Sequence, residues 1–354
     1  MKKLLSLFLL IGGILVLCLS FRFSKEAEAK TAFPENKALQ GRVIPIDTAL
    51  FKYPWRIRVN GDRAVVEDLH GPDYFFHLFS YPDFRYLSSF SKRGEGPEEM
   101  LQAENFRWEG ESVWTLDGNK SEMVQWQFNT RRDSLLRHRV VKLQKELFRA
   151  LDFTIYSGTR FLIPDYSGDN RFCWVDRQGK LIRKTGTIPS SNKKALQESR
   201  HALAYAWRSF IDYNPRNGVL VAATQLGDVL EVYNLKKNTH VVKVGEQGEP
   251  QFKVSRDGYG IPTGIMGYGD VQVTEGAIYT TFEGETFKDI ANNHQKGIRV
   301  PNGGNHIYVY TLEGEPLRKY ELDHYVEGIW VDEKKGVILA VDGNQDEPIV
   351  EFKM

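Results

Sequence analysis

The sequence contains very little cysteine. Only Cys18 and Cys173 occur among its 354 residues, and Cys18 lies in an apolar segment near the N-terminus. Cys173 therefore has no partner for an internal disulfide, so the fold must be held together without one. The aromatic and β-branched neighbours of Cys173 predict a buried strand, in which this thiol is an inert core residue.

An excess of charge of either sign is also missing. The chain has 47 Lys and Arg against 46 Asp and Glu. Nucleic acids and anionic membrane surfaces require a basic stripe, so this balance indicates neither as a partner. No stretch beyond residue 21 is long and apolar enough to span a bilayer, so we expect membrane association only through the N-terminal segment.

Familiar catalytic motifs are absent as well. The sequence has no GxSxG elbow, no HExxH helix and no CxxC pair, and its eight histidines are scattered singly. We therefore predict no catalytic residues and favour a protein that is not an enzyme, although the sequence leaves that question open.

Residues 1–29 have the features of an export signal or a membrane anchor. Lys2 and Lys3 precede a largely apolar run that ends at Phe21. Three interpretations compete: cleavage after a small-x-small site at 27–29, lipid attachment at Cys18, and an uncleaved anchor. Lipid attachment is weakened by the bulky Leu17, where a small residue is usual. Each interpretation predicts export, to the periplasm or to a membrane-anchored position at the cell envelope.

The main positive feature is an internal repeat. A strand that ends in a polar turn recurs six times, and the turn residues are 49, 48, 59, 59 and 59 positions apart. The turns lie at Asp68, Asp117, Asp165, Thr224, Glu283 and Asp342. Each of these strands is preceded by a glycine-containing hairpin turn and by another strand, and is followed by an aromatic-rich third strand. Repeats of this length, built from several short strands, are typical of β-propellers.

We therefore predict an all-β fold: a six-bladed β-propeller of four-stranded antiparallel blades, formed by residues 41–354. The sixth unit has only three strands after residue 329, while residues 42–46 form an unassigned strand before the first unit. We expect this N-terminal strand to complete the last blade and close the ring, because an open ring would expose a strand edge. Residues 30–40 are interpreted as a linker, residues 190–207 as a helical insertion, and residues 136–148 as a strand or a partly helical segment.

The six units resemble the TolB-like, NHL-related six-bladed β-propellers exported by Bacteroides-type bacteria. The most telling match is the Gly-Glu-Gly-Pro segment at 94–97, which follows a fourth strand, and a degraded copy stands at 245–250. The resemblance covers residues 42–353. It implies a propeller at the cell envelope, often a lipoprotein in this family, and it carries over no reaction.

Two long loops suggest where a ligand would bind. The connections at 245–269 and 283–306 belong to the sector of the fourth and fifth blades, and loops of this length are often functional. Their polar and aromatic residues suit a ligand surface, unless the glycine-rich loops merely flex. A third segment, beside the Gly-Glu-Gly-Pro turn, could cradle an anion or could be only a tight turn. The candidate ligand-binding residues are Arg93, Arg256, Tyr259, Tyr268, His294, Arg299 and His306.

The repeated turn acids allow two interpretations. Carboxylates around a channel mouth could hold a calcium ion, with Asp68, Asp117, Asp165 and Asp342 as weak candidates. Alternatively, each acid accepts hydrogen bonds from the amides of its own turn. Recurrence in nearly every unit favours the second interpretation, so we expect no cofactor.

Three functions remain in competition. The favoured one is a non-enzymatic binding or protein-interaction module at the cell envelope, which takes a protein, a small molecule or a carbohydrate on the long-loop face around the fourth and fifth blades. The alternative is a metal-assisted hydrolase or lactonase-like enzyme with its site at the channel mouth. A purely structural assembly subunit is a third possibility. The fold alone does not decide between them.

Overall fold

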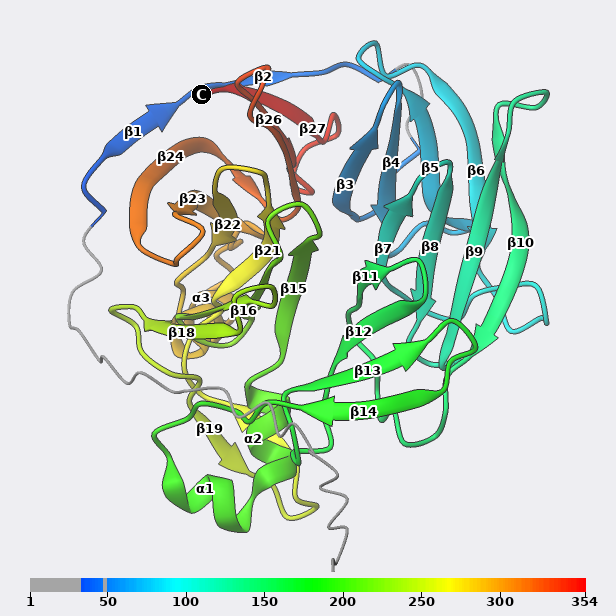
Figure 1. Ribbon diagram of the computed structural model, residues 1–354. Coiled ribbons are helices and arrows are strands. Elements are labelled where there is room, and N and C mark those ends of the chain that lie inside the picture. Colours follow the sequence, from blue (N-terminus) through cyan, green and yellow to red (C-terminus); the bar gives the residue numbers. More distant parts are fainter. Residues whose placement is uncertain (1–32, 47–49) are drawn as a thin grey trace, which may run out of the picture.

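The computed structural model describes residues 33–46 and 50–354, and it is a closed ring of six β-sheets (Figure 1). The segment at 1–29, with its three processing interpretations, lies outside the described residues. Each sheet is one blade of a propeller, and within a blade the successive strands are hydrogen-bonded and antiparallel. The predicted fold class is therefore confirmed.

The first five blades each take four consecutive strands of the propeller repeat. Blade 1 contains β3 (Pro54–Asn60), β4 (Arg63–Asp68), β5 (Tyr74–Ser80) and β6 (Tyr86–Lys92). Blade 2 contains β7 (Ala103–Glu109), β8 (Ser112–Asp117), β9 (Glu122–Asn129) and β10 (Ser134–Lys142). Blade 3 contains β11 (Thr154–Ser157), β12 (Arg160–Pro164), β13 (Phe172–Asp176) and β14 (Leu181–Thr185). Blade 4 contains β15 (Ser209–Asn214), β16 (Val219–Thr224), β17 (Val229–Asn234) and β18 (Thr239–Val244). Blade 5 contains β21 (Tyr268–Val273), β22 (Ile278–Phe282), β23 (Gly304–Tyr310) and β24 (Pro316–Val326).

Blade 6 is completed by the start of the chain. Its strands β25 (Ile329–Asp332), β26 (Val337–Val341) and β27 (Ile349–Lys353) are joined by β2 (Gly41–Val43), which pairs antiparallel with β27. The Ile44 N–H then donates to the carbonyl oxygen of Ile349 at 2.8 Å, and the side chains of Ile44 and Ile46 are buried against this sheet. The predicted ring closure by the N-terminal strand is therefore confirmed.

The segment expected to be a linker contains a further strand. β1 (Asn36–Leu39) pairs in parallel with β24, so blade 5 has a fifth strand at its outer edge. Leu39 is buried between blades 5 and 6, and the side chain of Glu35 forms an ion pair with Arg318 at 2.7 Å. The chain from Glu35 to Val43 thus ties two neighbouring blades together.

Three insertions interrupt the repeat. The expected helical insertion consists of α1 (Lys193–Glu198) and α2 (Arg200–Ala206), whose apolar side chains pack against blade 4. A hairpin of β19 (Phe252–Val254) and β20 (Gly260–Pro262) lies in the connection from blade 4 to blade 5 and contacts α2. The long connection within blade 5 contains α3 (Phe287–Gln295), a helix that the sequence analysis did not predict. Of residues 136–148, which had two interpretations, residues 136–142 belong to the strand β10 (Ser134–Lys142), and the remainder forms turns without a helix.

The hydrophobic core is divided among the six junctions between blades. Between blades 1 and 2, for example, Phe76 lies 5.4 Å from Phe106, measured between ring centroids. Hydrogen bonds join the innermost strands of neighbouring blades as well. In each, which we call a latch, a carboxylate at or just before one innermost strand accepts from a backbone N–H group of the next blade. The Asp152 carboxylate accepts from the Ile211 N–H at 2.8 Å, and Asp270 accepts from the Ile329 N–H at 3.0 Å. Each of these latches spans 59 residues, which is the repeat length of the later blades.

Candidate functional site

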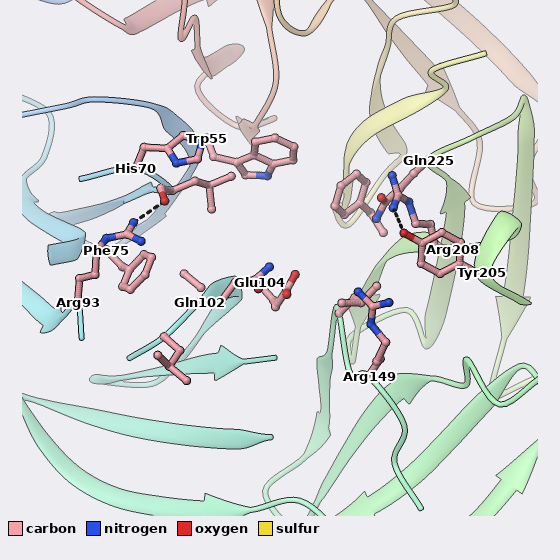
Figure 2. A pocket seen from close by; sticks show the side chains of 15 residues that line it. Trp55, His70, Phe75, Arg93, Gln102, Glu104, Arg149, Tyr205, Arg208 and Gln225 are labelled. Carbon is pink, nitrogen blue, oxygen red and sulfur yellow. Dashed lines mark hydrogen bonds between the residues drawn. The ribbon is translucent and has the colours of Figure 1, made fainter. Parts of the chain in front are cut away.

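A cavity of about 460 Å³ lies on the face where second strands turn into third strands and where one blade connects to the next. We call this the connecting face. Blade 1 contributes residues from one side of the cavity and blade 4 with α2 from the other, while Glu104 lies between them (Figure 2). The polar and aromatic residues of the lining are Trp55, His70, Phe75, Arg93, Gln102, Glu104, Arg149, Tyr205, Arg208, Phe210 and Gln225.

The lining residues occupy equivalent places in the repeat. Trp55 and Phe210 stand near the starts of the innermost strands β3 and β15, and His70 and Gln225 follow the second strands β4 and β16. The rings of Trp55 and Phe210 are 6.3 Å apart, so they form an aromatic wall across the mouth of the ring. Because consecutive strands alternate in direction, these positions necessarily meet at the connecting face.

Arg93, which the sequence analysis selected, does line the cavity. Its Nε donates to the carbonyl oxygen of Gly71 at 2.8 Å, and Nη2 donates to that of Leu69. Its guanidinium also lies 3.9 Å from the ring centroid of Phe75. Much of the donor capacity of Arg93 is therefore used to hold the turn after β4.

Two further arginines flank the ring of Tyr205 on α2. The guanidinium carbons of Arg149 and Arg208 lie 5.6 and 5.4 Å from its centroid. Arg208 donates from Nη1 to the Tyr205 hydroxyl at 3.3 Å, while its buried Nε has no hydrogen-bond partner. Arg149 is exposed and makes no hydrogen bond within the described residues. These two side chains are available to a ligand.

Glu104 is the single carboxylic acid among the described residues of the lining. Burial and, to a smaller extent, the nearby Glu67 raise its pKa to about 8, while Arg149 opposes the shift. Gly118 makes room for this carboxyl, because a Cβ there would lie 2.6 Å from Glu104 Oε1. Glu104 is therefore largely protonated at neutral pH and can donate a hydrogen bond.

A buried ionic network adjoins the cavity wall. The Arg56 guanidinium lies 4.9 Å from the ring centroid of Phe210 and forms an ion pair with Asp270 at 3.1 Å. Asp270 also binds Arg58 at 2.8 Å. The two guanidinium groups hold the pKa of Asp270 far below its usual range, against the effect of burial. This network joins blades 1, 5 and 6 and fixes the positions of Trp55 and Phe210.

The other predicted ligand-binding residues do not line this cavity, and they do not form one cluster. Arg256 and Tyr259 are exposed on the β19–β20 hairpin, while His294 and Arg299 are exposed on α3 and just after it. The ring of Tyr259 lies 5.8 Å from that of His201, measured between centroids.

Tyr268 and His306 belong to the structure of blade 5. Tyr268 is 3% exposed, donates to Asp228 at 3.0 Å and lies 3.1 Å from the Tyr310 hydroxyl, so it is not accessible to a ligand. His306 is half-buried on β23 beside Tyr308, and burial lowers its pKa.

The repeated turn acids accept hydrogen bonds from backbone amides. Asp117 accepts from the N–H groups of Leu101, Asn119 and Lys120 at 2.7 to 3.0 Å. Asp68 accepts in the same way, from the N–H groups at positions 52, 53 and 70. The other two acids, Asp165 and Asp342, each accept from a backbone amide within their own turn. Within residues 33–46 and 50–354, no group of three or more His, Cys, Asp and Glu is arranged to hold a metal ion.

Sequence reasoning missed most of the cavity lining, including Trp55, Glu104, Arg149 and Tyr205. These residues lie in different blades, and only the closed ring brings them together. A usable signal was the aromatic residue near the start of an innermost strand, at Trp55 in blade 1 and Phe210 in blade 4. The sequence analysis concentrated instead on the long loops at 245–269 and 283–306, although part of the cavity wall comes from the helical insertion that precedes blade 4.

Six blades around a common axis place the protein in the class of six-bladed β-propellers. Residues 32–334 match the family described as TolB-like 6-blade propeller-like, and the chain belongs to this family. No curated protein sequence matches the chain.

Two solved structures of Bacteroides proteins have the same fold. One is a member of the DUF4221 family from Bacteroides vulgatus, with a TM-score of 0.53 and 12% identity over 90% of this chain and 96% of that one. The other is a Bacteroides fragilis protein described as exported, with a TM-score of 0.51 and 11% identity over 90% of this chain and 97% of that one. At such identities the likeness concerns the fold alone. In the part of the chain that the structure describes, no helix is long and apolar enough to cross a bilayer.

Proposed function

We propose that this protein is an exported, non-enzymatic binding module of the cell envelope, and that its ligand occupies the cavity on the connecting face. The cavity carries the proposal. Its volume of about 460 Å³ lies within the range of small-molecule sites, roughly 300–1,000 Å³. Its wall combines aromatic rings with a few polar groups, which is the usual composition of such sites.

Export is supported from two sides. The N-terminal 29 residues have the charge and apolar pattern of an export segment, and a relative in fold is described as an exported protein. A ligand site on a propeller at the cell envelope would meet small molecules or the exposed parts of larger ones.

The chemistry of the lining favours binding over catalysis. Glycoside hydrolysis ordinarily needs two carboxyl groups, and the described lining contains one, Glu104. The described lining contains no serine, threonine, cysteine, lysine or aspartate, and its other possible nucleophiles, Glu104, His70 and Tyr205, form no hydrogen bond with one another. Most of the remaining polar groups are guanidinium groups and amides, which together with the aromatic rings can hold a ligand.

The location can be tested with two matched tyrosine variants. A panel of monosaccharides, disaccharides, organic acids and amino acids would first be screened by thermal shift, and each compound that stabilises the protein would be titrated by calorimetry. We expect Tyr205→Ala, in the cavity wall, to weaken binding at least tenfold. Tyr259→Ala, on the exposed hairpin near blades 4 and 5, should leave the affinity unchanged. The reverse pattern would move the site to the long loops, and binding unaffected by either variant would reject both locations.

A further inference from the structure

We propose that the cavity selects a small organic carboxylate that carries a ring, with the carboxylate held by Arg149 and Arg208 and the ring placed against the aromatic wall. This inference rests on the proposed function, which it makes specific. It follows from the charge of the cavity, from the geometry around Tyr205 and from the composition of the wall.

The first step is a contrast between two groups of arginines. Each arginine that is buried in the propeller forms an ion pair with a carboxylate of this chain, at 2.5 to 3.4 Å; these residues are Arg56, Arg58, Arg107, Arg171 and Arg177. The three arginines that line the cavity, Arg93, Arg149 and Arg208, form no ion pair among the described residues. Unlike the buried arginines, the arginines of the cavity are therefore left without a paired carboxylate among the described residues.

Glu104 does not remove this imbalance. It is the single acid of the described lining, and its pKa of about 8 keeps most of it neutral at pH 7. The cavity therefore has a surplus of positive charge in a partly desolvated place, where an anion gains more than it would in open water.

The second step is the geometry around Tyr205. Arg149 and Arg208 both lie within 6 Å of this one ring, at 5.6 and 5.4 Å from its centroid. The buried Nε of Arg208 lacks a partner, although a buried guanidinium nitrogen normally has one. Arg149 has a φ of +48°, which non-glycine residues adopt infrequently and which is often associated with function. Both guanidinium groups line the same cavity, and a guanidinium can bind the two oxygens of a carboxylate through parallel hydrogen bonds.

The third step concerns the rest of the ligand. A cavity of about 460 Å³ is much larger than an inorganic anion requires. Trp55 and Phe210 offer flat apolar surfaces to a ring, and the amides of Gln102 and Gln225 can both donate and accept hydrogen bonds. An acidic sugar, with a carboxylate, a ring and hydroxyl groups, uses all of these features, whereas an aromatic acid uses the first two.

The experiment compares ligands that differ in one group. Glucuronate and glucose share a ring but differ in the carboxylate, benzoate has an aromatic ring, and sulfate has no ring; each would be titrated by calorimetry into the exported domain, residues 30–354. We expect glucuronate or benzoate to bind at least tenfold more tightly than glucose and sulfate, and more weakly as salt is added. The preference between the two acids identifies the type of ring.

Variants then test the two arginines. Because a hydrogen bond to a charged group contributes about 1.5–3 kcal/mol, Arg149→Gln and Arg208→Gln should each weaken carboxylate binding about 10- to 100-fold. Arg149→Lys keeps the positive charge but loses the paired N–H donors of the guanidinium group, so this variant should bind the carboxylate with intermediate affinity. Arg132→Gln is the matched control, since Arg132 is exposed in the turn between β9 and β10, away from the connecting face.

The outcomes separate this inference from the proposed function. If glucose binds as tightly as glucuronate and its binding depends on Tyr205, the cavity is a ligand site but does not select a carboxylate. If sulfate binds as tightly as glucuronate or benzoate, the claim that the ligand needs a ring is wrong. Absence of carboxylate binding up to 10 mM, which corresponds to a binding free energy weaker than about −2.7 kcal/mol, would overturn the inference as a whole. Since Arg149 is exposed, its variant should fold normally, so the test remains valid if Arg208→Gln is unstable.

Discussion

Replacement of Asp270 by asparagine should destabilise the propeller strongly. This carboxylate is 1% exposed and accepts from Arg56 Nε at 3.1 Å and from Arg58 Nη1 and Nη2 at 2.9 and 2.8 Å. It also accepts from the backbone N–H groups of Val271 and Ile329. Asparagine keeps the shape but loses the charge, and its amide presents hydrogens toward two guanidinium groups.

The magnitude follows from the burial of the two arginines. Removal of one partner from a buried ion pair leaves an uncompensated charge in the interior and costs about 3–5 kcal/mol. Domains of this kind have about 5–15 kcal/mol of stability in total, so Asp270→Asn should remove a large part of it. The latch from Asp270 to the Ile329 N–H would weaken as well, which loosens the junction between blades 5 and 6.

Urea unfolding followed by tryptophan fluorescence measures this effect. We expect a lower midpoint for Asp270→Asn with little change in the slope of the transition. Glu351→Gln is the matched control, because the Arg42–Glu351 pair is at the surface, with the Arg42 side chain 64% exposed, and should contribute under about 1 kcal/mol. A loss below about 1 kcal/mol for Asp270→Asn would refute the claim that this network holds the ring together.

Three further predictions concern ring closure, pH and the turn acids. Ile44→Ala should cost about 2–4 kcal/mol in urea unfolding, because Ile44 is 6% exposed against blade 6; a loss as small as that of an exposed residue would contradict its role in closure. Burial raises the pKa of Glu327 from 4.5 to about 8, so the folded state binds more protons and stability should fall as pH rises from 4.5 to 8. Glu327→Gln should flatten this decline by about 4 kcal/mol in melting experiments across that range, and an unchanged pH profile would show that the carboxyl ionises normally. Asp117→Ala should cost about 2 kcal/mol through three lost amide contacts, whereas EDTA should leave the melting temperature of the unaltered protein unchanged; a drop with EDTA would revive the calcium interpretation.

The parts of the fold that repeat could be predicted from the sequence, and the parts that occur once could not. The blades and the closing strand follow from local signals, namely turn glycines, aromatic strands and a missing fourth strand. β1 was missed because its residues Asn36 to Ala38 are exposed and have no alternating pattern. α3 had a signal, since Thr286 is an N-cap residue that accepts from the Asp289 N–H, but the surrounding glycines and asparagines favoured a loop.

The site was harder to predict because its residues are far apart in the chain. Arg149 and Arg208 come from the entrances to blades 3 and 4, and nothing in their own neighbourhoods marks them as a pair. Arg93 was selected for its glycine-rich turn, and its place in the cavity wall could not be deduced from that turn. A charge surplus appears only when the partners of every arginine are known, which requires the tertiary structure.

The completion of blade 6 by the first strand has a consequence for the order of folding. Arg42 and Glu351 lie side by side but are 309 residues apart in the chain. Contacts of such separation form slowly, and here they cannot form at all until synthesis has reached residues 349–353. Until that moment the sixth sheet has an unoccupied outer edge, so a nascent or C-terminally shortened chain is the form of this protein most exposed to aggregation and proteolysis.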